Sequence, residues 1–291
     1  MLGKVLVENG QRVVCIVSRS MKSARAAGRV LGCRNVSTSL DAIPPETSLI
    51  YITTPHEAVV GVARSLARIS ALSWKTLTVC HASGMLSADV LEPIARKGAT
   101  VFSFHPLQTF PRDFRVGEIV PTARGIFYGV DGAPRALRVA RRFARALEGR
   151  AIEIPPTHRE LYHAACVLAS NHLTTMLWIL QRMHRAVTGS DRQFYAIYKP
   201  IVQATLRNLE RSSPAEALSG PIARGGVETV SRHFEALQQF LPELIPYFIA
   251  VSRETVGLAK ARGSLSEKGA GELMTLMNAY SLPSSTNKES R

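Results

Sequence analysis

Two short turns that contain histidine follow buried apolar runs of the sequence. The runs at 76–80 and 100–104 have the β-branched and aromatic content of buried strands, and each is followed at once by a histidine. Ligands of open parallel sheets bind outside the carboxyl ends of the strands, so these turns could line a cofactor or a substrate. The competing interpretation is that each histidine only caps a turn. We assign the first turn to cofactor binding and the second to substrate binding, with the candidates His81, Ser83, Gly84, His105 and Gln108.

A third histidine lies on a helix predicted to begin near residue 157. At about 100° per residue, His163, Ser170 and Thr174 fall on one stripe of this apolar helix, and Asn171 flanks the stripe. Imidazole suits general acid–base catalysis because its ordinary pKa is near neutrality. We predict that His163 transfers a proton and that Ser170 and Asn171 orient a carbonyl or a water. Alternatively, the histidine and asparagine are buried and hydrogen-bond to the backbone.

The predicted strand at 11–18 ends in Ser18-Arg19-Ser20. In dinucleotide-binding sheets an acidic residue here binds the ribose hydroxyls of NAD, whereas a cation accommodates the 2′-phosphate of NADP. A Ser-Arg-Ser turn offers a guanidinium and hydroxyls to that phosphate, so NADP is favoured over NAD. The alternative is a helix-capping serine beside a solvated arginine.

The predicted strand at 48–53 ends in a turn that contains Thr54 and Pro55. In folds of this type the corresponding turn passes under the cofactor, which makes both residues candidates for cofactor binding. Ordinary strand-to-helix punctuation explains the same residues equally simply.

A glycine-rich loop at 220–226 opens a predicted helix and contains Arg224. Backbone N–H groups and this arginine could bind an anionic group of a substrate, such as a carboxylate or a phosphate. The alternative is a helix–helix turn that needs glycine for a positive φ.

The first half of the chain alternates strand and helix patterns. Such alternation is typical of βαβ units and a parallel sheet, so we predict an α/β fold. The predicted strands are 11–18, 48–53, 76–80, 100–104, 125–130 and 151–154, and the predicted helices are 20–31, 56–71, 87–97 and 134–148.

The pattern changes at Pro155-Pro156, beyond which no strand run follows. Proline disfavours helix and stiffens a junction, so we predict a Rossmann-like domain at 1–155, an all-helical domain at 156–282 and a disordered tail at 283–291. The predicted helices of the second domain are 157–189, 193–212, 227–239, 241–262 and 265–281.

The start of the sequence lacks one part of a Rossmann unit. Residues 2–8 predict a helix that leads directly into the strand at 11–18, the positions of the first helix and the second strand. The first strand and its G-x-G-x-x-G turn, whose backbone N–H groups face the pyrophosphate, are missing. We expect that the true start lies upstream and that the domain is truncated. The other hypothesis is that the site has been lost.

Composition narrows the possible partners. The 291 residues are 46% hydrophobic and carry a net charge of +14, which favours anionic partners. The arginines are scattered and no nucleic-acid motif is present, so specific nucleic-acid binding is not expected. No apolar run of about 18 residues and no signal peptide is seen, and we expect no membrane span and a cytoplasmic location. Four cysteines without a CxxC pair and eight histidines without ligand spacing predict neither disulfide nor metal.

Taken together, the motifs at 81–84, 105–110, 162–171 and 220–225 resemble those of one family. Its members join a Rossmann-like domain to a helical domain of unknown function (the 2520 type). They resemble the 6-phosphogluconate-dehydrogenase-like superfamily, which includes pyrroline-carboxylate and ketopantoate reductases. The resemblance covers the chain to about residue 260 and implies an NADP-type cofactor, a homodimer, and reduction of a small carbonyl or imine.

This sequence departs from that pattern twice. It lacks the glycine-rich turn, which bears on cofactor binding, and it has His163 where several reductases of the superfamily use lysine. The predicted function is therefore an NADP-dependent oxidoreductase with an unidentified small, possibly anionic substrate. The alternatives are a non-catalytic nucleotide- or anion-binding protein or scaffold, and nonspecific binding of anionic polymers driven by net charge.

Overall fold

The computed structural model describes residues 2–110 and 123–281. The predicted tail at 283–291 lies outside these residues. The chain divides into two compact units, Met1–Thr174 and Thr175–Arg291. The first helix after Pro155-Pro156 therefore groups with the sheet, although the sequence change at the two prolines suggested an earlier boundary.

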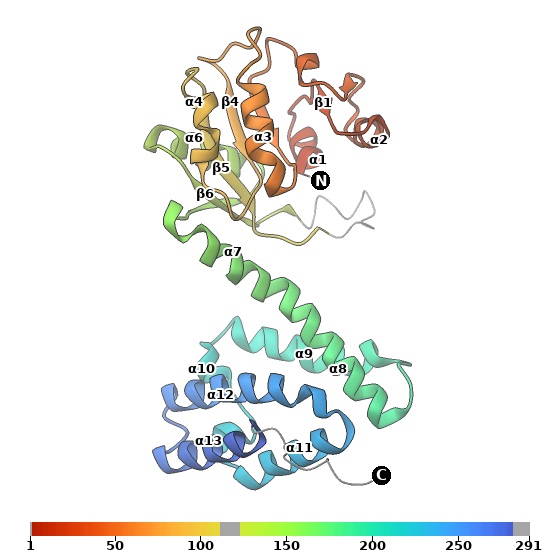
Figure 1. Cartoon of the computed structure of the whole chain (residues 1–291), viewed down its shortest axis with the longest axis vertical. Helices are drawn as coiled ribbons and strands as arrows, with labels where there is room; N and C mark the ends of the chain where they lie inside the picture. The colour runs from red at the N-terminus through yellow and green to blue at the C-terminus, as the bar shows by residue number, and fades with distance from the viewer. Residues whose placement is uncertain (1, 111–122, 282–291) are drawn as a thin grey trace, which may run out of the picture. The chain divides into compact units, whose positions relative to one another are not determined.

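The first unit is built on a five-stranded sheet in the order β3-β4-β5-β6-β7. Its strands β4, β5 and β6 are labelled in Figure 1. All neighbouring pairs are parallel except β5 and β6. The two last strands thus run against the other three, a reversal that the strand composition did not predict. The strands are β3 (Leu49–Ile52), β4 (Thr78–His81), β5 (Thr100–Pro106), β6 (Phe127–Asp131) and β7 (Arg150–Glu153).

A second, two-stranded parallel sheet is formed by β1 (Ile16–Val17) and β2 (Val36–Ser37). The predicted strand at 11–18 is thus much shorter in the structure, and β2 was missed because two residues show no periodicity. In the described residues β1 pairs only with β2 and β3 only with β4. The sheet of a Rossmann unit is therefore interrupted between β1 and β3.

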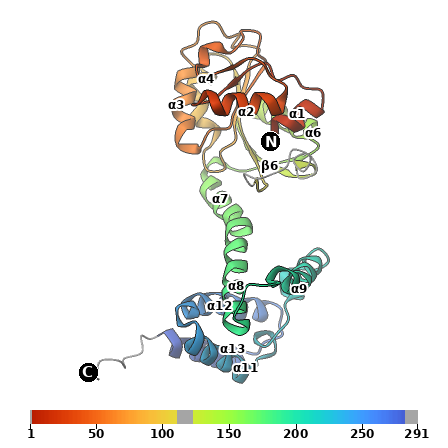
Figure 2. The ribbon, with the colours of Figure 1, turned by 90° about the vertical axis from the view of Figure 1, so that its right-hand side faces the viewer.

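Helices cover both faces of the five-stranded sheet (Figures 1 and 2). Successive residues of a strand point to opposite faces, and accordingly Val79 packs in the cluster with α3 whereas Cys80 packs in the cluster with α6. The helices that precede β7 in the first unit are α1 (Leu2–Glu8), α2 (Met21–Leu31), α3 (His56–Leu66), α4 (Glu92–Ala95) and α6 (Pro134–Ala146). Short 3₁₀ turns are η1 (Leu40–Ala42), η2 (Ala88–Leu91) and η3 (Pro156–His158).

The predicted helix at 157–189 consists of three parts. α7 (Arg159–Val167) leads into a five-residue π-helical segment, η4 (Leu168–His172), and then into α8 (Leu173–Thr188). A π turn is wider than an α turn, so it changes the angle between residues before and after it. π turns inside α-helices often lie at functional sites.

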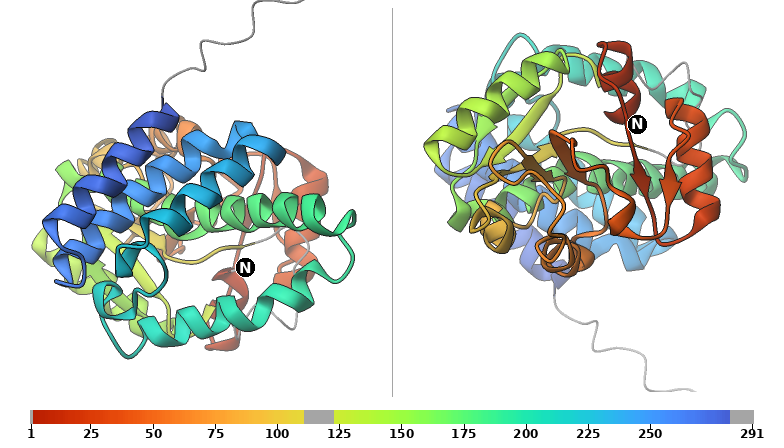
Figure 3. Two further views of the ribbon diagram at one scale, coloured as in Figure 1. Left: turned by 90° about the horizontal axis from the view of Figure 1, so that it is seen from below. Right: turned by 90° about the horizontal axis from the view of Figure 1, so that it is seen from above.

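The described residues of the second unit form helices joined by turns and loops, without a strand. Its core is formed mainly by α11 (Val227–Phe240), α12 (Ile245–Ala261) and α13 (Glu267–Ser281), with Ile179 of α8. By contrast α9 (Phe194–Leu209) buries no side chain and stands away from α11 and α13 (Figures 2 and 3). The short elements are α10 (Pro214–Ala217), η5 (Ile222–Arg224) and η6 (Pro242–Leu244). None of the helices in the two described ranges is long and apolar enough to cross a membrane.

Candidate functional site

The strand register brings the second histidine turn beside the first helix after the prolines. His105, near the carboxyl end of β5, is paired with Gly129 of β6. α7 packs here, and its Tyr162 places the phenol oxygen 2.9 Å from Nδ1 of His105. The two rings meet edge to face, with centroids 5.6 Å apart. His105 and α7, far apart in the sequence, therefore form one site in the first unit.

His163 and Gly84 complete this site. The rings of His105 and His163 have centroids 6.2 Å apart. A Cβ on Gly84 would lie 2.7 Å from Cδ2 of His163 and 3.0 Å from Nε2 of His105, so both rings approach this backbone too closely for a side chain. We call His105, Tyr162, His163 and Gly84 the His105–His163 cluster. Three of its four members were sequence candidates for the site.

His105 is neutral at physiological pH. Burial, together with the smaller effects of the nearby His163, Arg159 and His81, lowers the pKa of His105 to about 4. A neutral imidazole can accept a hydrogen bond at one nitrogen and donate one at the other. His105 is thus suited to hydrogen bonding a substrate rather than to carrying a charge.

His81, the other strand-end histidine, has a different environment. Its side chain is fully buried, with Nε2 3.0 Å from the carbonyl oxygen of Ser87 and Nδ1 accepting from the backbone N–H of Ser83 at 3.2 Å. Ser83 Oγ in turn accepts from the N–H of Leu86. Burial lowers the pKa of His81. Both ring nitrogens are used inside the turn, which matches the turn-capping alternative.

A buried charged network lies next to the site. Arg159 and Asp131 are 1% and 4% exposed, and Arg159 Nε donates to Asp131 Oδ2 at 2.5 Å. The same carboxylate accepts from Ser103 Oγ at 2.7 Å and from the N–H of Ala88 at 2.6 Å. Within the described ranges, the two terminal guanidinium nitrogens of Arg159 have no hydrogen-bond partner. The guanidinium also lies 5.8 Å from the centre of the Tyr162 ring, so the network supports the site.

Sequence reasoning did not assign roles to Tyr162, Arg159, Asp131 or Ser103. Ser103 and Asp131 left a signal, since each is a polar residue within or at the end of a buried apolar strand and must find a partner there. Arg159 left none, because an arginine in the first turn of a helix is ordinarily solvated.

The other predicted residues of α7 and η4 lie farther along the helix. Ser170 and Asn171 follow His163 by about two turns and fall in the π-helical segment. Ser170 Oγ donates to Asn171 Oδ1 at 3.3 Å, and Ser170 O accepts from Thr174 Oγ1. The predicted stripe assumed a uniform 100° per residue, which the π segment does not keep.

The predicted cofactor residues that follow β1 and β3 lie just beyond the ends of these strands. Ser20 caps α2 through the N–H of Ser23, which matches the capping alternative for this serine. The backbone N–H of Ser18 donates to Ser37 O. Arg19 is exposed and makes no ion pair within the described ranges. After β3, Pro55 precedes α3, and Thr54 Oγ1 is buried with no hydrogen-bond partner among the described residues.

Two predicted substrate residues are exposed. Gln108 accepts a hydrogen bond from the N–H of Thr109. Arg224 lies in η5 of the second unit, followed by Gly225 with φ of 69° and preceded by Gly220 with φ of 102°. The loop therefore has the backbone geometry of the glycine-dependent turn.

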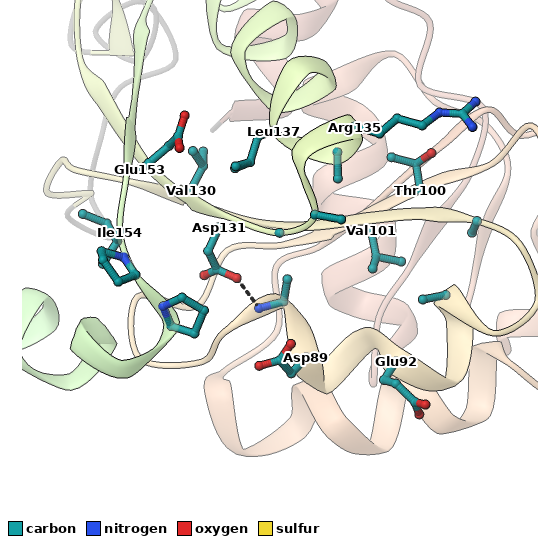
Figure 4. A pocket seen from close by; sticks show the side chains of 18 of the residues that line it. Asp89, Glu92, Thr100, Val101, Val130, Asp131, Arg135, Leu137, Glu153 and Ile154 are labelled. Atoms are coloured by element: carbon teal, nitrogen blue, oxygen red, sulfur yellow. Dashed lines mark hydrogen bonds between the residues drawn. The ribbon is translucent and has the colours of Figure 1, made fainter.

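A cavity of about 670 Å³ lies elsewhere in the first unit (Figure 4). Its lining includes Thr100 and Val101 at the amino end of β5, whereas His105 lies at the carboxyl end. Asp131 reaches its wall, hydrogen-bonded to the backbone of Ala88. The lining of this cavity contains no residue of the His105–His163 cluster. Within the described ranges no group of three potential metal ligands is found.

Comparisons with known proteins agree with this architecture. Residues 1–106 match the family model of the Rossmann-like domain, and residues 126–255 match the domain of unknown function DUF2520. The chain therefore carries a Rossmann-like domain followed by a DUF2520 domain, which confirms the family resemblance of the sequence motifs. Curated proteins give no match.

Solved structures share the fold at low sequence identity. A protein from Thermotoga maritima is 21% identical over 90% of this chain and 94% of its own, with a TM-score of 0.67. An inferred NADP oxidoreductase from Bacteroides fragilis is 19% identical, covering 88% and 93%, with a TM-score of 0.69. The imine reductase of Myxococcus stipitatus, in complex with NADP+, is 13% identical, covering 96% and 89%, with a TM-score of 0.54. At these identities the similarity shows the fold.

Proposed function

We propose that the chain is an NADP-dependent oxidoreductase that reduces a small carbonyl or imine. The observation that carries the proposal is the His105–His163 cluster, two histidines and a tyrosine gathered near the carboxyl ends of β4 and β5, where sheets of this kind bind ligands. The names of two structural neighbours support it, an imine reductase in complex with NADP+ and an inferred NADP oxidoreductase.

The residues present fit part of an NADP molecule. Arg19, exposed and without an ion-pair partner in the described residues, would bind the 2′-phosphate. The buried Thr54 Oγ1 at the end of β3 needs a hydrogen-bond partner, which a cofactor could supply. The pyrophosphate has no such cradle in the sequence, because no G-x-G-x-x-G turn is present. The interruption between β1 and β3 lies where that strand and turn would be.

NADPH, when bound, would supply a hydride to the carbonyl or imine carbon. His163 would give the proton to the oxygen or nitrogen and regain one from water, so that the product is an alcohol or an amine. His105, neutral at physiological pH, would hydrogen-bond the reacting group. In this proposal Ser170, Asn171 and Gln108 orient the substrate. Arg224, in the glycine-rich loop of the second unit, is a separate candidate for binding an anionic group.

Titration with NADPH and NADH, followed by nicotinamide fluorescence, tests the cofactor. We expect NADPH to bind more tightly, and Arg19→Ala to remove that preference while Arg25→Ala, an exposed arginine on α2, leaves it unchanged. No binding of either nucleotide, also after any residues encoded in frame upstream are included, would rule out the proposal. Once NADPH binding is established, His163→Ala should abolish turnover but leave NADPH affinity unchanged.

One observation favours a second candidate, a non-catalytic nucleotide- or anion-binding protein. The interrupted sheet leaves β1 and β3 each without a second strand partner among the described residues, at the position where the pyrophosphate turn belongs. This candidate predicts nucleotide binding that is unaffected by His163→Ala, and no turnover with any carbonyl or imine tested.

We also propose that the chain is a homodimer formed through α9. This helix has apolar residues on all sides and buries none of them, with Tyr195 66%, Ile197 52% and Ile201 65% exposed. A helix that is apolar all round is normally buried, and obligate homodimer interfaces are the most apolar ones. Light scattering should give twice the chain mass, and the paired change Ile197→Lys and Ile201→Lys should give a monomer. Val251→Lys on α12, an exposed apolar position outside α9, is the control.

A further inference from the structure

The hydrogen bond between Tyr162 and His105 can be made in two ways. Either the phenol O–H donates to Nδ1 of His105, which puts the imidazole proton on Nε2, or Nδ1–H donates to the phenol oxygen. The choice matters because Nε2 is the nitrogen beside Gly84, whereas Nδ1 faces Tyr162. Only in the first arrangement does Nε2 of His105, the nitrogen beside Gly84, carry a proton that it can donate to a ligand.

The surroundings of Tyr162 favour the first arrangement. Burial raises the pKa of Tyr162, so the phenol keeps its proton and must donate it. Its other side-chain partner is Cys166, and burial raises the pKa of that thiol as well. A thiol sulfur is a weak acceptor, whereas a neutral imidazole nitrogen is a good one. The phenol proton therefore goes to Nδ1 of His105 rather than to the sulfur of Cys166.

Tyr162 is also fixed in place. A Cβ on Gly129 would lie 2.4 Å from the phenol oxygen, so the hydroxyl rests directly on the backbone of β6. Glycine inside a strand is unfavourable unless something needs close approach to the backbone, and here the phenol does. The guanidinium of Arg159, held by Asp131, also lies 5.8 Å from the ring centre.

We propose that Tyr162 is a positioning residue that holds His105 in the Nε2–H tautomer, so that His105 presents a hydrogen-bond donor beside Gly84 and His163. The ligand class that fits this donor is a group with an acceptor lone pair, a carbonyl oxygen or an imine nitrogen. That use rests on the proposed function, whereas the tautomer does not. His105 would then polarise the acceptor without losing its proton, and His163 would supply the transferred proton.

The tautomer can be measured directly on the full chain labelled with ¹⁵N-histidine. Long-range ¹H–¹⁵N correlation spectra at pH 7 distinguish a protonated ring nitrogen from an unprotonated one, and His105→Gln identifies the signals of His105. We expect the wild-type protein to show the proton on Nε2 only. Tyr162→Phe should shift the two nitrogen signals toward a mixture of tautomers, and Gly129→Ala, which displaces the hydroxyl, should do the same.

Tyr128→Phe is the matched control. Tyr128 is a buried tyrosine on β6, and its hydroxyl has no hydrogen-bond partner in the described residues, so its removal should leave the His105 signals unchanged. A wild-type His105 protonated on Nδ1, or signals unchanged in Tyr162→Phe, would overturn the proposal. Because the spectra need no cofactor or substrate, they stand apart from the oxidoreductase proposal: a chain with the Nε2–H tautomer that binds no NADPH would contradict only the latter.

Discussion

His81 and His105 occupy matching places in the sequence but different environments in the structure. Each directly follows a predicted buried strand, yet His81 is fully buried and uses both ring nitrogens within its own turn. His105 is half-buried, holds Tyr162 with one nitrogen and turns the other toward Gly84. The environment of a histidine at a strand end thus depends on the partners that later parts of the chain bring.

The difference arises because β5 is longer than β4. In the register, His81 is paired with Ser103, so β5 continues beyond the end of β4 and carries His105 past the level of His81. There α7 supplies Tyr162 and His163, whereas His81 is enclosed by the turn that follows it. The longer strand exposes its histidine to another element, and the shorter one does not.

The buried network beside both turns should give the largest effect on stability. Asp131→Ala removes three hydrogen bonds and leaves the buried Arg159 without its counter-ion, which should lower the free energy of unfolding by about 3–5 kcal/mol. Urea denaturation measures it. Arg232→Ala, which removes an exposed pair with Glu228, should cause no measurable change. A loss below about 1 kcal/mol for Asp131→Ala would show that the network does not hold the two turns.

The depressed pKa of His105 should make stability depend on pH. Its folded-state pKa of about 4 lies below the ordinary value near 6.5, so between these values the unfolded chain binds more protons. Stability is therefore full above pH 6.5 and falls by roughly 1.4 kcal/mol per pH unit down to pH 4, about 3 kcal/mol in all from this group. Urea denaturation at pH 7, 5 and 4 should show a shallower decline for His105→Asn than for the wild type. If stability declines equally with pH in His105→Asn and in the wild type, a group other than His105 causes the pH dependence.

Substitution of the two histidines should separate stability from activity. His81→Ala loses two hydrogen bonds and buried packing, about 2 kcal/mol of stability, but should retain turnover per folded molecule. His105→Asn should change stability by less than about 1 kcal/mol at pH 7 and lower kcat by about 10²-fold, as for loss of a hydrogen-bond donor to the reacting group. If thermal melts and rate assays show a stability loss for His105→Asn and a loss of turnover for His81→Ala, His81 is the residue that acts on the substrate and His105 is the structural one.

Two glycines give the smallest stability effects and the finest test of the cluster. Gly84→Ala should move the His163 ring and lower kcat severalfold with little change in stability, because only side-chain atoms must give way. Gly61→Ala, exposed on α3 with nothing near its Cβ, should raise stability by about 0.5–1 kcal/mol and leave kcat unchanged. If Gly84→Ala is as active as the wild type, His163 does not need its observed place.

The sequence determined most of the elements and the order in which they come. Buried apolar runs predicted β3, β4 and β5 within two residues, because each is long enough to show composition and is bounded by turn residues. The strand at 11–18 was overestimated and β2 was missed, because strands of two residues depend on pairing with each other rather than on their own pattern. The motifs also named His105, His163 and Gly84 as candidates, and the structure places these three residues close together.

Only the tertiary structure decided which polar residues meet. Tyr162 reaches His105 across 57 positions of sequence, and Arg159 reaches Asp131 across 28, contacts that depend on strand register and on the direction of α7. The π segment likewise changed the place of Ser170 and Asn171, because a helical stripe read from sequence assumes constant geometry. Local composition specifies elements through short-range backbone preferences, whereas a site depends on the relative placement of elements, which packing and register fix.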